Sequence, residues 1–180
     1  MANVAAIVLA AGKGTRMKSD LVKVMHLLGE RPMISWPVGA AKEVGASHIA
    51  LVVGHQGDTV REHFSGDASV LFAEQSEQLG TGHAVACARQ ALEGFSGTVL
   101  ILCGDVPLIR GETLAAMLAS HGSRGAAVSV LTTHLENPYG YGRVVKREGG
   151  RIIRIVEEKD ATEEERFITE INSGIYCVDA

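Results

Sequence analysis

The chain has 180 residues, of which 46% are hydrophobic and 21% charged, a composition that is ordinary for a globular domain. The net charge of −4 argues against a general nucleic-acid-binding surface, and no apolar run approaches the ~20 residues of a transmembrane helix, so we expect neither nucleic-acid binding nor membrane insertion. The length predicts one domain of residues 1–180, and the three widely spaced cysteines predict a cytoplasmic protein without a disulfide framework.

Apolar runs alternate with helical patterns in the first part of the chain. Strands are predicted at Val4–Ala11, His48–Gly54, Ser69–Ala73 and Thr98–Cys103. Helices are predicted at Met33–Val44, with Pro32 suited to the first turn and Gly45 at the end, at Thr81–Leu92 and at Gly111–His121. This alternation is typical of βαβ units, so we expect a largely parallel sheet with helices on both faces.

The pattern changes after Ala126, where strands with short polar connections follow one another. They are predicted at Val128–Thr132, Arg143–Lys146, Ile152–Glu157 and Ser173–Val178. Gly149-Gly150 indicates a hairpin, and Glu163–Glu165 is expected to face solvent on a short helix. The predicted fold class is therefore α/β, a Rossmann-like, mostly parallel twisted sheet with helices on both faces and added antiparallel strands.

The loop after the first predicted strand, Leu9-Ala10-Ala11-Gly12-Lys13-Gly14-Thr15-Arg16-Met17, has the features of a phosphate site. Its glycines let a ligand approach the main chain, and backbone N–H groups in such a turn form an anion-binding cradle. Positive charge around it comes from Lys13, Arg16, Lys18 and Lys23. The alternative is a strand-ending turn beside a solvated basic patch.

Two further motifs follow predicted strands, and ligands of open α/β sheets bind beyond such strand ends. In Glu74–His83, Gln75 offers an amide suited to reading a base edge, although the segment also fits a plain helix start with Thr81 as N-cap. In Cys103–Pro107, Asp105 could ligate Mg²⁺ or could simply accept hydrogen bonds within a turn. Among the seven histidines, only His83 is singled out, because it lies beside the second glycine loop.

In this order, the motifs resemble those of the sugar-nucleotide pyrophosphorylases. The likeness is greatest to the uridylyltransferase domains of the bifunctional bacterial N-acetylglucosamine-1-phosphate uridylyltransferase / glucosamine-1-phosphate N-acetyltransferase family. The matching positions are 9–17, Lys23, Gln75, 77–84, 104–108, 140–143, 156–162 and 170–174. The resemblance implies the nucleotide-diphospho-sugar transferase fold.

The resemblance also implies a role for each matching residue. Arg16 and Lys23 would contact the phosphates as catalytic cations, with Arg16 the principal one. The nucleotide would be bound by Leu9, Ala10, Ala11, Gly12, Gln75, Gly80, Thr81, Cys103, Gly104 and Asp105. Of these, Gln75, Gly80 and Thr81 would hold the uracil. Gly142, Glu157 and Asn172 would bind the N-acetylglucosamine ring, and Asp105 would ligate Mg²⁺.

The implied reaction joins UTP and N-acetylglucosamine 1-phosphate to give UDP-N-acetylglucosamine and pyrophosphate, with Mg²⁺ as cofactor. This nucleotidyltransferase step supplies cell-wall precursors for peptidoglycan and lipopolysaccharide. One alternative is a pyrophosphorylase for another sugar 1-phosphate or another nucleotide. A second is a non-catalytic, nucleotide-sensing domain of the same fold.

The sequence departs from this family at Val22, where proline usually precedes the phosphate-binding lysine, and at Cys103, where tyrosine is usual. Without that proline, the loop around Lys23 is expected to be less rigid. The chain also ends at Ala180, before the family's second Mg²⁺ ligand and before the left-handed β-helix that carries acetyl transfer and trimerisation. We therefore expect a truncated uridylyltransferase domain that is monomeric without the β-helix.

Overall fold

The computed structural model describes residues 3–12, 14, 17–19, 21–54 and 56–180. The chain forms two compact units. The first comprises residues 1–129 and 176–180, and the second comprises Val130–Ile175. Among the described helices, none has both the length and the apolar character needed to cross a bilayer.

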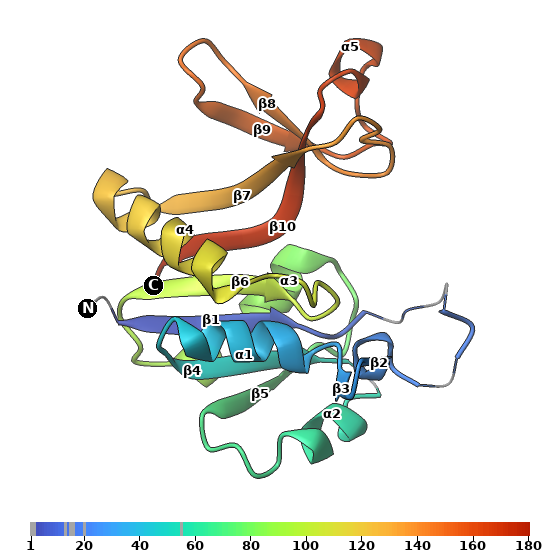
Figure 1. Cartoon of the computed structure of the whole chain (residues 1–180), viewed down its shortest axis with the longest axis vertical. Helices are drawn as coiled ribbons and strands as arrows, with labels where there is room; N and C mark the ends of the chain where they lie inside the picture. Colours follow the sequence, from blue (N-terminus) through green and yellow to red (C-terminus); the bar gives the residue numbers. More distant parts are fainter. Residues whose placement is uncertain (1–2, 13, 15–16, 20, 55) are drawn as a thin grey trace. The chain divides into compact units, whose positions relative to one another are not determined.

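The first unit is built on parallel strands, as the apolar runs predict. The strands are β1 (Val4–Leu9), β4 (Ala46–Val53), β5 (Val70–Glu74) and β6 (Thr98–Cys103). They lie in the order β5-β4-β1-β6 and are paired in parallel throughout (Figure 1). Residues Tyr176–Asp179 of the last strand add an antiparallel partner to β6. The predicted parallel sheet is therefore confirmed.

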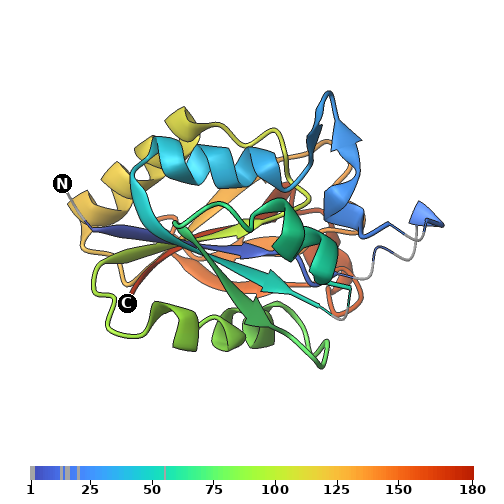
Figure 2. The same ribbon diagram turned by 90° about the horizontal axis from the view of Figure 1, so that it is seen from below.

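Helices cover both faces of these strands. They are α1 (Ser35–Glu43), α2 (Asp58–His63), α3 (Thr81–Cys87) and α4 (Gly111–Arg124), with 3-10 turns at η2 (Lys23–Met25) and η3 (Gln90–Leu92). Figure 2 shows α1 and α4 on one side of the strands and α3 on the other. On the α3 side, Ala5 and Ile7 of β1 pack in one cluster with Ala84 and Ala88. These small alanines allow the helical segment to approach the strands closely.

Some predicted boundaries differ from the structure. Pro32 does not begin the first helix, because it lies in the short ribbon of β2 (Leu27–Leu28) and β3 (Arg31–Pro32). The helix begins at Ser35, and Pro37 occupies the first turn, where an N–H group has no helical acceptor to lose. The helix predicted to reach Leu92 ends at Cys87. Tighter 3-10 turns follow it, and in one of them Leu92 N donates a hydrogen bond to Arg89 O at 3.3 Å.

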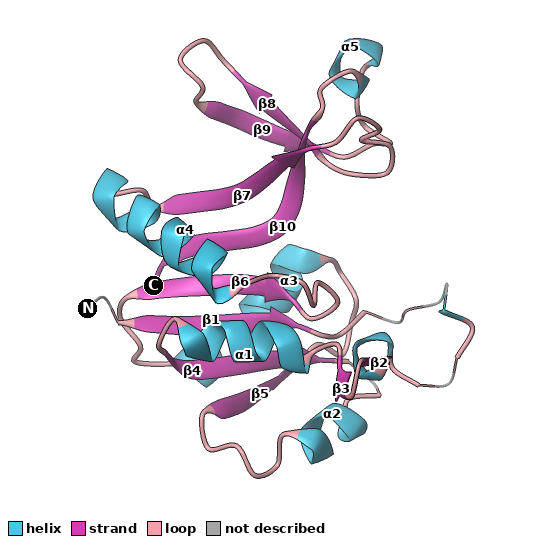
Figure 3. Ribbon diagram, in the orientation of Figure 1, coloured by secondary structure: helices cyan, strands magenta, loops and turns pink. Residues whose placement is uncertain are grey.

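The second unit is antiparallel. It contains most of β7 (Val128–His134), β8 (Arg143–Lys146), β9 (Ile152–Val156), the first part of β10 (Glu170–Asp179) and α5 (Glu163–Arg166) (Figure 3). Strands β8 and β9 pair antiparallel, and the turn between them contains Gly149 and Gly150 with φ of +87° and +77°. Glycine adopts such angles without steric cost, and the predicted hairpin is confirmed.

The short helix α5 forms where it was predicted. Its N-cap, Thr162, accepts a hydrogen bond from Glu165 N, and the Glu165 side chain accepts one from Thr162 N in return. Glu163 and Glu164 are exposed as expected. The expectation was wrong for Glu165, whose side chain is only 12% exposed because it also accepts a hydrogen bond from Arg154.

Candidate functional site

The carboxyl ends of the parallel strands meet at one edge of the first unit. Leu9, the last residue of β1, lies opposite Val52 of β4 and Cys103 of β6. Just beyond that row, Gly104 N donates a hydrogen bond to Leu9 O at 2.9 Å. The predicted phosphate loop and the Asp105 loop are therefore neighbours at the start of both loops.

The described part of the predicted phosphate loop runs from the protein interior to the surface. Ala10 and Ala11 are buried, and Gly12 is exposed with nothing within 4 Å of the position that a Cβ atom would take. Gly14 has φ of +57°, and a Cβ atom there would lie 2.7 Å from Lys23 Cβ. The loop therefore passes directly over Lys23, at a point where only glycine fits.

Part of the predicted cationic rim lies outside the described residues. This applies to Lys13 and Thr15, and to Arg16, which the family resemblance makes the principal catalytic cation. Lys18 is described and is exposed. The roles expected for Lys13 and Arg16 stay predictions.

Lys23 and Asp105 form an ion pair at this edge. The distance from Lys23 Nζ to Asp105 Oδ2 is 2.5 Å, and the two side chains are 34% and 36% exposed. Lys23 is presented by η2, and the preceding Val22 has φ of −53°, an angle that proline also adopts. Next to Asp105, a Cβ atom on Gly104 would lie 2.9 Å from Leu9 O, so glycine is required for this close approach. The predicted phosphate cation and metal ligand thus lie together.

Cys103 lies beside this pair and carries a neutral thiol. Burial raises the pKa of the Cys103 thiol to about 11, and the nearby Asp105 carboxylate contributes in the same direction. A thiol with such a pKa is protonated at neutral pH and is a poor nucleophile. The side chain of Cys103 therefore adds no formal charge beside Lys23 and Asp105 at neutral pH.

The second glycine loop places a buried amide near the same strand ends. Gln75 is 5% exposed, and its backbone N–H donates to Val53 O at 2.8 Å. Its side-chain Nε2 lies 3.1 Å from Gly80 O and 3.2 Å from His83 Nδ1. Gly80, with φ of +103° and ψ of −179°, is the N-cap of α3, and Thr81 is the first helical residue. The interpretation of Thr81 as N-cap was therefore wrong, because the sharp turn requires glycine one residue earlier.

Gln78 links the two loops and was not singled out from the sequence. Its side-chain Nε2 donates a hydrogen bond to Ala11 O at 2.6 Å. The same carbonyl oxygen lies 2.9 Å from the position of a Cβ atom on Gly54, which follows β4. Gln78 therefore ties the second glycine loop to the predicted phosphate loop. The sequence signal that could have identified it is its place between Gln75 and Gly80, inside the matching segment 77–84.

The three predicted sugar-binding residues come together in the second unit. Asn172 N donates to Gly142 O at 2.8 Å, and the Asn172 Oδ1 atom accepts from Gly174 N at 3.0 Å. A Cβ atom on Gly142 would lie 3.1 Å from Glu157 Oε1. These residues come from three separate segments around β8, β9 and β10, so their proximity is a property of the fold.

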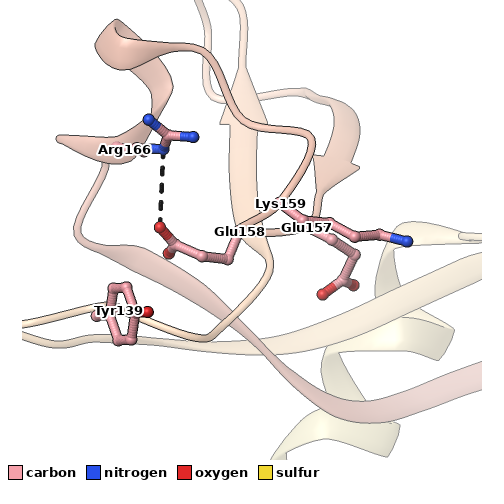
Figure 4. Close-up of a pocket in the computed structure, with 5 residues that line it drawn as sticks. All are labelled: Tyr139, Glu157, Glu158, Lys159 and Arg166. Carbon is pink, nitrogen blue, oxygen red and sulfur yellow. Dashed lines mark ion pairs between the residues drawn. The ribbon is translucent and has the colours of Figure 1, made fainter.

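Glu157 also lines an open pocket of the second unit. The pocket has a volume of about 670 Å³ and is lined by Tyr139, Glu157, Glu158, Lys159 and Arg166. Figure 4 shows Glu158 turned toward Arg166, whereas the side chains of Glu157 and Lys159 extend away from it. Among the described residues, Lys159 forms no ion pair, and it was missed although the matching segment 156–162 contains it.

Glu158, the next residue in the pocket, pairs with the buried Arg143. It accepts hydrogen bonds from Arg143 Nη2 at 2.5 Å and from Gly140 N at 3.1 Å, and Arg166 Nε lies 3.7 Å away. The hydrogen bond from Arg143 is the main reason that the pKa of the Glu158 carboxyl lies below its usual value, and the Gly140 N–H adds to it. Glu158 therefore neutralises the buried Arg143.

The described residues contain one carboxylate suited to the predicted metal. No three His, Cys, Asp or Glu side chains in the described part of the chain form a metal-binding group. Mg²⁺ commonly takes only one or two carboxylates and completes its shell with water and substrate phosphates. Asp105, whose side chain is about one-third exposed beside the predicted phosphate loop, fits that pattern.

Comparison with known proteins identifies the family of the chain. Residues 6–165 match the family model of the MobA-like NTP transferase domain. The chain belongs to this family. It is therefore a nucleotidyltransferase domain.

Curated relatives of this NTP transferase domain carry the name Bifunctional protein GlmU. The protein of that name from Geobacter metallireducens is 67% identical over 180 residues, which is 100% of this chain and 38% of the relative. The proteins of that name from Pelobacter propionicus and Geobacter sulfurreducens are 64% and 63% identical to this chain. Both matches cover 100% of this chain, and they cover 39% and 38% of the two relatives. The chain thus spans somewhat more than a third of the relatives that it matches.

A solved structure shows the same fold at lower identity. It comes from Bacillus anthracis, is assigned as a glucose-1-phosphate thymidylyltransferase and contains a bound sucrose. The TM-score is 0.82 at 22% identity, and the match covers 98% of this chain and 71% of the other. This neighbour confirms the α/β fold with helices on both faces and added antiparallel strands.

Proposed function

We propose that the chain is the uridylyltransferase part of an enzyme that transfers UMP from UTP to N-acetylglucosamine 1-phosphate, giving UDP-N-acetylglucosamine and pyrophosphate. The observation that supports the reaction type is the Lys23–Asp105 pair at the strand-end edge, beside the phosphate loop. The relatives named Bifunctional protein GlmU support the choice of substrates. The enzyme would act in the cytoplasm on precursors of the cell wall.

The chemistry needs charge neutralisation and alignment more than proton transfer. The attacking oxygen of a sugar 1-phosphate is already ionised at neutral pH, so no general base is required. The obstacle is the repulsion between two polyanions that must react in line. Lys23 and Lys18 are described cations near the loop, and Arg16 is the predicted catalytic one.

The ion pair indicates how substrate binding would change the site. A triphosphate beside Lys23 would compete with Asp105 for the ammonium group, and the released carboxylate would be available to a cation. Asp105 would then hold Mg²⁺, whose chemistry is to neutralise the developing charge on the phosphate oxygens. Lys23 would thus contact the phosphates directly, and Asp105 would act on them through the cation that it holds.

The sugar 1-phosphate would be bound by the second unit. Glu157 and Asn172 offer hydrogen-bond acceptors and donors for ring substituents, and Gly142 leaves room beside Glu157 that a side chain would fill. Lys159 adds an unpaired positive charge to the Glu157 pocket among the described residues, which suits the phosphate of this substrate. We propose Lys159 as an addition to the predicted sugar site.

The experiment is a pyrophosphate-release assay with Mg²⁺, UTP and N-acetylglucosamine 1-phosphate. Replacing the sugar by glucose 1-phosphate, or UTP by TTP, CTP or ATP, should lower turnover, because a site built to hydrogen-bond a particular group rejects analogues that lack it. Pyrophosphate release that is fastest with another pair would show the alternative pyrophosphorylase. Nucleotide binding without any release would show the sensing domain.

Asp105→Asn tests the metal ligand directly. We expect turnover to fall about 10²-fold or more, because electrostatic stabilisers of this kind contribute on that scale. Glu93→Gln is the matched control, since Glu93 is an exposed carboxylate of the same unit that follows η3. Equal activity of the Asp105→Asn variant and this control would contradict the proposed role of Asp105.

A further inference from the structure

One side chain of the second glycine loop holds the backbone of the predicted phosphate loop. Gln78 Nε2 donates a hydrogen bond of 2.6 Å to Ala11 O, across 67 residues of sequence. Gln78 itself lies at the centre of a three-residue turn, in which Leu79 N donates to Glu77 O at 3.0 Å. The donor is therefore presented from a constrained piece of backbone.

This bond accompanies a change of direction in the chain after β1. The strand lies between β4 and β6, and Leu9 O accepts from Gly104 N on the β6 side. In a continued strand, the carbonyl two residues later would point to the same side. Ala11 O lies instead toward Gly54, which follows β4 and whose Cβ position is 2.9 Å away. Gln78 thus holds the Ala11 carbonyl on the β4 side.

The same peptide plane sets the direction of the Gly12 N–H group. The described chain contains no cis peptide bond, and in a trans peptide the C=O of one residue and the N–H of the next point in opposite directions. With Ala11 O on the β4 side, the Gly12 N–H points to the β6 side, where Asp105 follows the strand. No described residue accepts a hydrogen bond from this N–H, and Gly12 is exposed. The group is therefore open to a ligand.

We infer that Gln78 is a positioning residue that aims the Gly12 N–H group at a nucleotide phosphate. This inference rests on the proposed function, which places UTP at the predicted phosphate loop. An N–H group directed at an anion forms a charge-assisted hydrogen bond, which is stronger than a bond between neutral groups. A glycine peptide is conformationally free, so an unanchored Ala11–Gly12 plane would have to be ordered when the phosphate binds. Gln78 orders it beforehand.

The side chain can be changed so that only the donor is lost. Gln78→Met removes the N–H and keeps a side chain of similar length and volume. Gln90→Met is the matched control, because Gln90 is an exposed glutamine of η3 in the same unit. Gln78→Lys restores a donor. Gln78→Met combined with Ser76→Lys, at an exposed position of the same loop, adds the same charge without restoring the donor at position 78.

The test compares two ligands that share a base and a ribose. UTP binding is measured by calorimetry with Mg²⁺, and binding of uridine, which has no phosphate, by ligand-observed NMR. We expect Gln78→Met to bind UTP about tenfold more weakly than the wild type and uridine equally well, because one charge-assisted bond loses its preset direction. Gln78→Lys and Gln90→Met should stay within about threefold of the wild type for UTP, and the double variant should resemble Gln78→Met. Retained uridine binding also shows that a variant is folded.

Several results would overturn the inference. UTP affinity in Gln78→Met equal to that in Gln90→Met would remove the role of Gln78, and an equal loss for UTP and uridine would assign it to the loop as a whole. A loss in Gln78→Lys as large as in Gln78→Met would indicate packing, and recovery in the double variant would indicate charge alone. The proposed reaction fails separately, because the expected binding pattern without pyrophosphate release would contradict the reaction and support the role of Gln78.

Discussion

Arg143 shows how a single buried charge is accommodated. It is 1% exposed, and its guanidinium donates to Tyr141 O and to the Glu158 carboxylate. A buried guanidinium without a carboxylate partner would be costly, so Arg143 depends on Glu158 for its burial. The same hydrogen bond from Arg143 is the main reason that the pKa of the Glu158 carboxyl is lowered.

Stability should therefore depend on acid through Glu158. A carboxyl whose pKa is lowered on folding contributes stability above its ordinary pKa of about 4.3, and this contribution is lost as the pH falls through the folded value. We predict that Glu158→Gln lowers the urea midpoint at pH 6 and flattens its decrease between pH 6 and pH 3. Glu164→Gln, on the exposed face of α5, is the control. Parallel pH profiles for the wild type and Glu158→Gln would disprove the linkage.

Among the elements, α4 is fixed at its last turn by a buried histidine. His121 is 2% exposed, its Nδ1 lies 2.9 Å from Ser129 Oγ, and its Nε2 lies 3.1 Å from Asp179 Oδ1. Ser129 lies at the start of β7 and Asp179 at the end of β10, so residues from three elements meet at this ring, all of them within the first unit. The helix ends at Arg124, and the C-cap residue Gly125 follows with a φ of +55°.

We predict that His121→Leu lowers the free energy of unfolding by about 2 kcal/mol, because two hydrogen bonds of about 1 kcal/mol each are lost. Asp179→Asn should cost less, since that side chain is 64% exposed and an amide oxygen can still accept. Urea unfolding followed by circular dichroism measures both. A neutral or stabilising effect of His121→Leu would mean that packing outweighs these bonds.

The sequence predicts best those elements in which the same burial or pairing pattern continues from the first residue to the last. Thr98–Cys103 and Arg143–Lys146 were predicted with the observed ends, because burial or pairing continues along each strand. The helix Asp58–His63 was missed, since it is short, mostly polar and has one buried residue, Val60. Pro32 was misplaced because a proline signal cannot distinguish a helix start from a ribbon end.

Site residues were predicted by type and spacing, whereas their partners required the fold. The sequence alone does not show that Lys23 Nζ forms an ion pair with Asp105 Oδ2, because 82 residues separate the two side chains. The same holds for the bond between Gln78 and Ala11, at a separation of 67 residues. Side-chain geometry of this kind depends on which strand ends are adjacent, which local patterns do not encode.

At the scale of the whole molecule, the predicted ligand sites divide between the two units. The described nucleotide residues, such as Gln75 and Asp105, lie in the first unit, and Gly142, Glu157 and Asn172 lie in the second. If each unit binds its own substrate, affinity for one substrate can be changed without changing affinity for the other. This separation makes the two halves of the proposed site independently testable.

We predict that Glu157→Gln raises the KM for N-acetylglucosamine 1-phosphate about tenfold or more and leaves the Kd for UTP unchanged. Hydrogen bonds to a charged group contribute about 1.5–3 kcal/mol, which corresponds to this range. Steady-state kinetics and calorimetry measure the two constants. Glu164→Gln again serves as the control, and a matching rise in the Kd for UTP would contradict the division of binding between the units.

The protonated state of Cys103 has a consequence for the durability of the site. Peroxides and alkylating electrophiles attack thiolates, and a group whose pKa is about 11 is almost entirely in the inert form at neutral pH. A sulfur atom beside Asp105 is therefore held in the form that reacts slowly with oxidants. If the proposed reaction takes place at this edge, we expect its rate to resist mild peroxide treatment better than that of a thiolate-dependent enzyme.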